Sequence, residues 1–110
     1  MKQGKYIVQL TEFSLIEGID DNSFLKATAK AQSRFWKKQK GFISRELLNS
    51  ESNQWVNITY WTSRDEAQDA TKAFLNHPGS YPYVLMIAPS SIKELYLHLV
   101  LDTMLPRLII

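Results

Sequence analysis

Six side chains in this sequence have the types and positions to bind and ionise an aromatic molecule. His98 is the best candidate base, because imidazole titrates near neutral pH. Aromatic side chains can form the walls of a site, and amide side chains can hold an oxygen atom of a ligand. The other candidates are Phe13, Trp61 and Tyr96 as aromatic walls and Gln9 and Asn57 as amides. Their convergence is predicted from strand alternation.

Each chemical interpretation competes with a structural one. His98 is also typical of an interface histidine satisfied by hydrogen bonds, and Trp61 of a packing residue. His77 is expected at a helix end, where it complements the helix dipole. Glu46 is expected either in solvent at the rim of the sheet or paired with an arginine of a partner chain.

Other kinds of site find no support in the sequence. The chain has no cysteine, which excludes disulfides and thiolate chemistry and suits a reducing compartment, so we expect a cytoplasmic protein. Its two histidines are far apart and form no metal-binding motif, so we expect no metal. Its four glycines form no phosphate-binding loop, and we expect no cofactor.

Charge and hydropathy argue against nucleic-acid and membrane partners. The net charge is +2, and the basic residues of segment 26–40 are best explained as a solvated helix face. Residues 40–42 resemble the start of an RNA-recognition strand motif, but the later aromatic residues are missing. The apolar stretches 83–88 and 95–101 are too short to cross a bilayer, and we expect no secretion signal at the N-terminus.

The predicted elements follow the order strand, helix, strand, strand, helix, strand. Alternation predicts strands at residues 6–13, 42–48, 54–61 and 92–101, and helical spacing predicts a helix at 23–39. Ser63 and Glu66 form a capping box that begins the second helix, and residues 76–79 end it. This order is typical of the α+β ferredoxin-like sandwich, a four-stranded antiparallel sheet with both helices on one face.

Alternation also divides the sheet into two faces. We expect the helices to cover an aliphatic face that includes Val8, Leu10, Val56 and Ile58. The opposite face then holds all six candidate site residues, and a second copy of the chain is expected to cover it. The result is a homodimer with a barrel-like interior and a cleft for an amphipathic molecule.

The chain length suits one domain, residues 1–110. Its core is expected at about residues 5–101, followed by a tail at 102–110. The tail is expected to pack on the partner or on the chain's own helices.

Several motifs together resemble the antibiotic biosynthesis monooxygenase-like proteins of the dimeric α/β barrel superfamily. They are Gly-Phe at 41–42, Arg-Glu-Leu-Leu at 45–48, a strand at 55–60 followed by Trp-Thr-Ser, Glu-Ala-x-x-Ala at 66–70 and Asn-His-Pro at 76–78. The resemblance covers roughly residues 5–101. It implies a dimer, a cleft between sheet and helices and, in some members, cofactor-free oxygenation of acidic phenols.

Other members of the superfamily degrade haem, and this chain departs from their pattern. The resemblance implies that the haem-degrading members need an asparagine in the first strand and a tryptophan and a histidine along the second helix. This chain has Gln9 in the first strand, no tryptophan in the second helix, and His77 only at the end of that helix. Haem degradation is therefore disfavoured.

Two functions from different classes follow. The first is a homodimer that binds a small aromatic or lipophilic molecule and acts as a cofactor-independent monooxygenase. His98 would take a proton from the phenol, and Asn57 or Gln9 would hold the charged oxygen. The second is a non-catalytic dimeric interaction module, its cleft filled by side chains. A solvent-connected cavity that reaches His98, Trp61 and Asn57 would favour the first.

Overall fold

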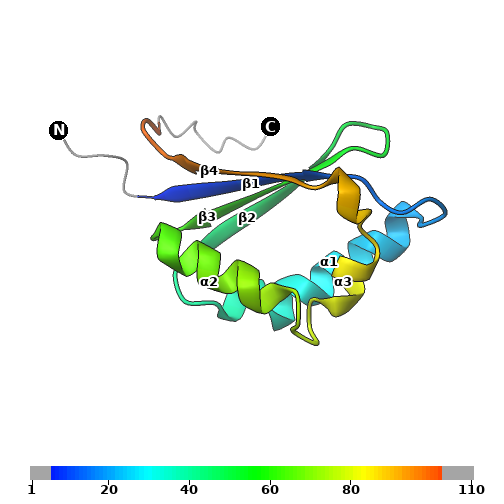
Figure 1. Ribbon diagram of the computed structural model, residues 1–110, viewed down its shortest axis with the longest axis horizontal. Coiled ribbons are helices and arrows are strands. Elements are labelled where there is room, and N and C mark those ends of the chain that lie inside the picture. Colours follow the sequence, from blue (N-terminus) through cyan, green and yellow to red (C-terminus); the bar gives the residue numbers. More distant parts are fainter. Residues whose placement is uncertain (1–5, 103–110) are drawn as a thin grey trace, which may run out of the picture.

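The protein forms two layers, a sheet and a group of helices that covers one of its faces (Figure 1). The computed structural model describes residues 6–102. The strand order is β2-β3-β1-β4, and every pair of neighbours is antiparallel. This architecture confirms the predicted α+β ferredoxin-like βαββαβ sandwich. The predicted packing of the tail concerns residues that lie almost entirely outside the described range.

The element bounds match the predicted order closely. The strands are β1 (Ile7–Phe13), β2 (Phe42–Asn49), β3 (Trp55–Trp61) and β4 (Lys93–His98). The helices are α1 (Asp21–Arg34), α2 (Arg64–Phe74) and α3 (Tyr81–Leu85), with 3-10 turns η1 (Trp36–Lys38) and η2 (Pro89–Ser91). The helix expected at 23–39 ends earlier and continues as η1. Within residues 6–102 no helix is both long enough and apolar enough to span a membrane.

Short polar side chains begin both long helices. Oδ1 of Asp20 accepts a hydrogen bond from the backbone N–H of Ser23 at 2.7 Å. Oγ of Ser63 accepts one from the backbone N–H of Glu66 at 3.1 Å, as the capping-box prediction requires. The carboxylate of Glu66 then accepts from the Ser63 hydroxyl at 3.2 Å rather than from its backbone. These caps set where α1 and α2 start.

The prediction of which sheet face the helices cover is wrong. In β3 the buried residues are Trp55, Asn57, Thr59 and Trp61, and the residues between them are half-buried. The helices therefore cover the aromatic and polar face. The open face carries an aliphatic set mixed with polar and charged residues. The aliphatic residues are Val8, Leu10, Leu48, Val56, Ile58, Leu95 and Leu97, and the others are Glu12, Ser44, Glu46, Tyr60 and Lys93. Alternation separates the two faces but does not say which of them meets the helices.

Aromatic side chains dominate the core between the two layers. Phe24 of α1 lies 4.9 Å from the Trp55 ring and 5.1 Å from the Tyr83 ring. Phe74 of α2 stacks on Trp36 at 4.8 Å. Large rigid rings make edge-to-face and stacked contacts with one another, but they do not fill all of the irregular space between the two layers. The space left between them is the cavity described next.

Candidate ligand-binding site

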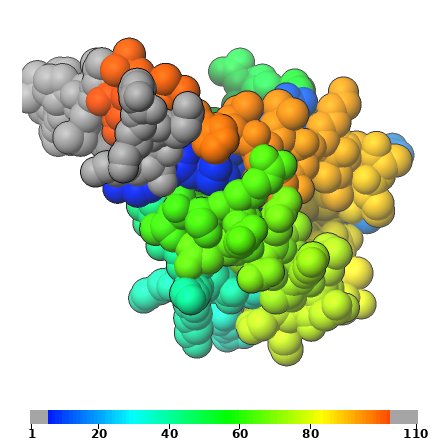
Figure 2. Space-filling view, turned by 60° about the vertical axis from the view of Figure 1, so that its left-hand side comes forward, coloured from blue at the N-terminus to red at the C-terminus, as the bar shows by residue number. Residues whose placement is uncertain are grey.

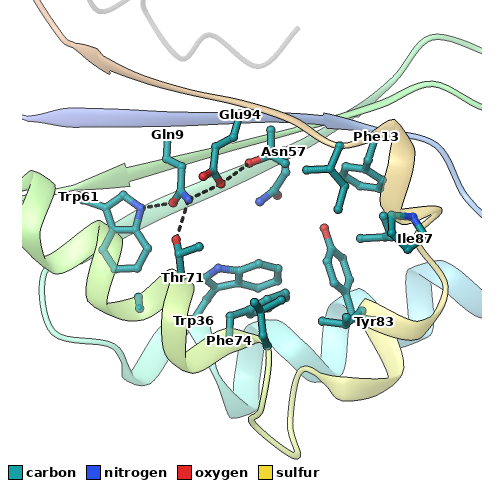
Figure 3. Close-up of a pocket in the computed structure, with 16 residues that line it drawn as sticks. Gln9, Phe13, Trp36, Asn57, Trp61, Thr71, Phe74, Tyr83, Ile87 and Glu94 are labelled. Atoms are coloured by element: carbon teal, nitrogen blue, oxygen red, sulfur yellow. Dashed lines mark hydrogen bonds between the residues drawn. The ribbon is translucent and has the colours of Figure 1, made fainter.

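A cavity of about 380 Å³ lies between the sheet and the helices of a single chain (Figure 3). This volume falls within the range of known small-molecule sites. Strands β1, β3 and β4 form its roof, and α2, α3 and η1 form its floor. In the space-filling view the surface of α2 (green) meets that of the β4 region (orange) on this side of the molecule (Figure 2).

One end of the cavity is apolar and aromatic. Its walls include Phe13, Trp36, Phe74 and Tyr83, each from a different element or turn. Phe13 and Tyr83 meet edge to face at 6.1 Å. Aromatic edges and faces arranged in this way favour a planar unsaturated ligand. This end therefore suits a ring system.

Gln9 is the centre of the polar end. Its Oε1 accepts from the indole N–H of Trp61 at 2.9 Å. Its Nε2 lies 2.8 Å from Oγ1 of Thr71, 2.9 Å from Oε2 of Glu94 and 3.4 Å from Oη of Tyr96. An indole is only a donor, so the amide has one orientation that satisfies these contacts. Gln9 is thus a fixed polar group at the cavity wall.

The side-chain amide of Asn57 is also held in one orientation, by a hydrogen bond from Arg45. Nε of Arg45 donates to Oδ1 of Asn57 at 2.6 Å, and Nη2 of the same guanidinium donates to Oγ1 of Thr28. The guanidinium also lies 3.7 Å from the Trp36 ring centroid. A guanidinium only donates, so Oδ1 must face Arg45 and the NH₂ group of Asn57 is turned away from it. That NH₂ group contacts Thr59 at 3.3 Å and can donate to a ligand.

Burial changes the ionisation of two groups beside the cavity. Burial raises the pKa of Tyr83 from 10.0 to about 12, although the nearby Arg45 lowers it. Burial lowers the pKa of Arg45, which stays protonated because its reference value is so high. Tyr83 is therefore a neutral hydroxyl donor at physiological pH, with a cation behind it.

The structure brings together most of the predicted site residues. Gln9, Phe13, Asn57 and Trp61 line the cavity, and Tyr96 contacts Gln9 beside it. His98 does not line it. That residue ends β4 opposite Ile7, and its side chain is exposed. Its role as a base stays a prediction, without a cavity contact to support it.

Sequence reasoning missed other residues of the site. Trp36 and Tyr83 were absent from the predicted set because they lie outside the strands, in η1 and α3. Arg45 was noted only as part of a motif. Glu94 shares a face with Tyr96 by alternation, and this signal was available without the structure.

The cavity lies between sheet and helices, as the resemblance implied, and not on the opposite face of the sheet. The chain is therefore a ferredoxin-like protein with a cavity whose volume lies in the range of small-molecule sites. Solved structures with this fold include antibiotic biosynthesis monooxygenases and proteins similar to them, as the following comparisons show.

The chain is 22% identical to SnoaB of Streptomyces nogalater, a cofactor-independent oxygenase, with a TM-score of 0.61 over 94% of this chain and 99% of that one. It is 16% identical to a candidate antibiotic biosynthesis monooxygenase of Bordetella bronchiseptica, with a TM-score of 0.73 over 90% and 100% of the two chains. A mutant of MhuD with two manganese protoporphyrin IX molecules per active site is 17% identical, with a TM-score of 0.65 over 88% and 97%.

These likenesses confirm the predicted resemblance to antibiotic biosynthesis monooxygenase-like proteins at the level of fold. No family model matches the chain, and no curated protein sequence matches it.

The residues of the cavity do not fit a haem. Among residues 6–102, no histidine lines the cavity to serve as an axial ligand. Nδ1 of His77 accepts from the backbone N–H of Gly79 at 2.9 Å, and the ring packs on Phe35 at 5.2 Å. The described lining also offers no cation for the propionates.

Proposed function

We propose that this chain binds a small aromatic molecule in the cavity and acts on it as a cofactor-independent monooxygenase. The observation that carries the proposal is the pairing of an aromatic cavity with two amide groups of fixed orientation, Gln9 and Asn57. The structural likeness to SnoaB, a cofactor-independent oxygenase, supports cofactor-independent oxygenation as the class of reaction.

Cofactor-free oxygenation places three demands on a site. The ligand must lose a proton, its negative charge must be held while it reacts with dioxygen, and water must be kept out. The NH₂ group of Asn57 and the hydroxyl of Tyr83 are the donors available for a ligand oxygen. Arg45 behind them contributes a positive potential, because it has no acidic partner among the described residues. The aromatic end supplies the apolar surroundings.

We also propose that a second copy covers the open sheet face. Leu95 and Leu97 on β4 are 56% and 44% exposed there, and Leu48 on the opposite edge strand, β2, is 48% exposed. Pairing the same face of two copies about a two-fold axis would bury them. This dimer differs from the one predicted from sequence, because it buries the aliphatic face and leaves the cavity inside each chain.

Thermal-shift screening against phenols, quinones, flavins and haem tests the ligand proposal, because a ligand that binds only the folded protein raises its apparent stability. We expect shifts with phenols or quinones. Ile92→Trp should abolish them, because Ile92 is half-exposed at the cavity wall and a larger side chain there would close it. Ile43→Trp is the matched control, since Ile43 is similarly exposed and does not line the cavity.

The outcomes separate the two functional classes. A shift lost in Ile92→Trp and kept in Ile43→Trp would justify oxygen-uptake assays with the ligand that was found. His98→Ala should keep the shift if that residue has no part in binding. A screen with no shift for any class would favour the alternative, a non-catalytic dimeric interaction module.

A further inference from the structure

We propose that Glu94 is the proton acceptor of the cavity, an assignment that rests on the function proposed above. Glu94 is the one charged side chain among the sixteen residues that line the cavity. It points from β4 into the cavity beside Gln9 (Figure 3). Glu94 is itself exposed, so its carboxylate can be reached both from solvent and from the cavity, and it forms its strongest contacts with O–H or N–H donors.

A chain of hydrogen bonds fixes the carboxylate in place. The Trp61 indole donates to Oε1 of Gln9, which turns the NH₂ group of Gln9 toward Glu94. Trp61 is 1% exposed and Gln9 is 7% exposed, so both are held rigidly by their surroundings. They act as positioning residues for Glu94.

The hydrogen bonds to Glu94 leave one of its oxygens for a ligand. Gln9 donates to Oε2 at 2.9 Å, and Oγ1 of Thr11 reaches the same atom at 3.4 Å. Both of these hydrogen bonds end on Oε2, and neither uses Oε1. A ligand hydroxyl at the polar end of the cavity would therefore meet Oε1.

Two other titratable groups face Glu94. They are Tyr96 on its own strand and Arg64 on α2, whose guanidinium lies 5.0 Å from the Tyr96 ring centroid. Burial raises the pKa of Tyr96, so its hydroxyl is neutral at neutral pH. Among the residues that line the cavity, Glu94 is therefore the one carboxylate that can accept a proton from a ligand.

The proton step is simple. The O–H bond of the ligand breaks, the proton passes to Oε1 of Glu94, and the electron pair remains on the ligand oxygen. The resulting anion is the species that cofactor-free chemistry with dioxygen requires. Glu94 thus takes the role that the sequence alone suggested for His98.

The test compares two probes of nearly equal shape, 2-naphthol and its methyl ether, by fluorescence titration. Naphthol offers an O–H group to Glu94, and the ether does not. Hydrogen bonds to charged groups are the stronger class, so the wild-type protein should bind naphthol roughly tenfold more tightly. In Glu94→Gln the preference should fall to about threefold, typical of a neutral bond. Glu17→Gln, at an exposed turn residue, is the matched control and should keep the wild-type preference.

Rescue by a conservative variant provides a readout that a purely structural role would not move. Glu94→Asp keeps the carboxylate and should restore part of the preference for naphthol that Glu94→Gln loses. The assignment is overturned if Glu94→Gln keeps the tenfold preference, or if the wild-type protein binds both probes equally; the aromatic-binding function then stands. If the wild-type protein binds neither probe, the proposed function fails and the assignment fails with it.

Discussion

Nε of Arg45 donates to Oδ1 of Asn57 at 2.6 Å, and this contact joins a buried cation to the wall of the cavity. The guanidinium is stabilised by neutral acceptors and by the Trp36 ring rather than by a carboxylate among the described residues. The arrangement orients the Asn57 amide and leaves a positive potential behind it. Both effects bear on how the site treats an anionic ligand.

Replacing Arg45 by methionine should destabilise the protein. Arg45→Met keeps apolar contact with Trp36 but leaves Oδ1 of Asn57 and the Thr28 hydroxyl without their donor. The expected loss is about 2 kcal/mol of unfolding free energy in urea titration. Lys37→Met removes an exposed cation and should change stability little. Equal stability of the two variants would show that the Arg45 contacts contribute nothing net.

The Tyr83 hydroxyl should ionise at a pH well above the ordinary pKa of a tyrosine. Burial raises its pKa from 10.0 to about 12. Because the folded pKa lies above the unfolded one, the associated stability is fully present below pH 10 and is lost as the pH rises toward 12. Tyrosinate absorbance should show a late phase that is missing in Tyr83→Phe, with circular dichroism to confirm the fold. A single phase near pH 10 in the folded protein would contradict this.

Gly41 should tolerate alanine poorly. Its φ of 84° is unfavourable for other residues, and an added Cβ would lie 2.9 Å from Cβ of Glu66. Gly18 has a φ of 94° and nothing within 4 Å of an added Cβ, so Gly18→Ala measures the backbone cost alone. That cost is roughly 1 kcal/mol, and Gly41→Ala should exceed it in thermal or urea unfolding. Equal losses would mean that the Glu66 side chain moves aside freely.

The open sheet face should hold the dimer together. Leu95→Lys places a charge among the aliphatic residues of this face, beside Leu10, where pairing would remove it from water. We expect the wild-type protein to be a dimer and Leu95→Lys to be a monomer by light scattering at micromolar concentration. Leu75→Lys, a 57%-exposed leucine outside this face, should remain a dimer. A wild-type monomer would refute the proposed assembly.

Local chemistry made much of the fold predictable. Strand alternation, the Ser63 cap and the order of elements identified every strand and both long helices before the structure was known. The same alternation placed Gln9, Asn57 and Trp61 on one face, and the structure puts all three at the cavity. These are short-range properties, written in side chains a few residues apart.

The structure alone decided which face the helices cover and which residues complete the site. Strand alternation puts Leu10 and Gln9 on opposite faces of the sheet, but it does not indicate which of the two faces is buried by the helices. That choice depends on how the large rings of Trp36 and Tyr83, brought by elements distant in the sequence, fit against the sheet. Glu94 lines the cavity and His98 does not, a difference that strand alternation alone does not predict. Packing of distant surfaces sets these features, because side-chain volumes have to match across the two layers.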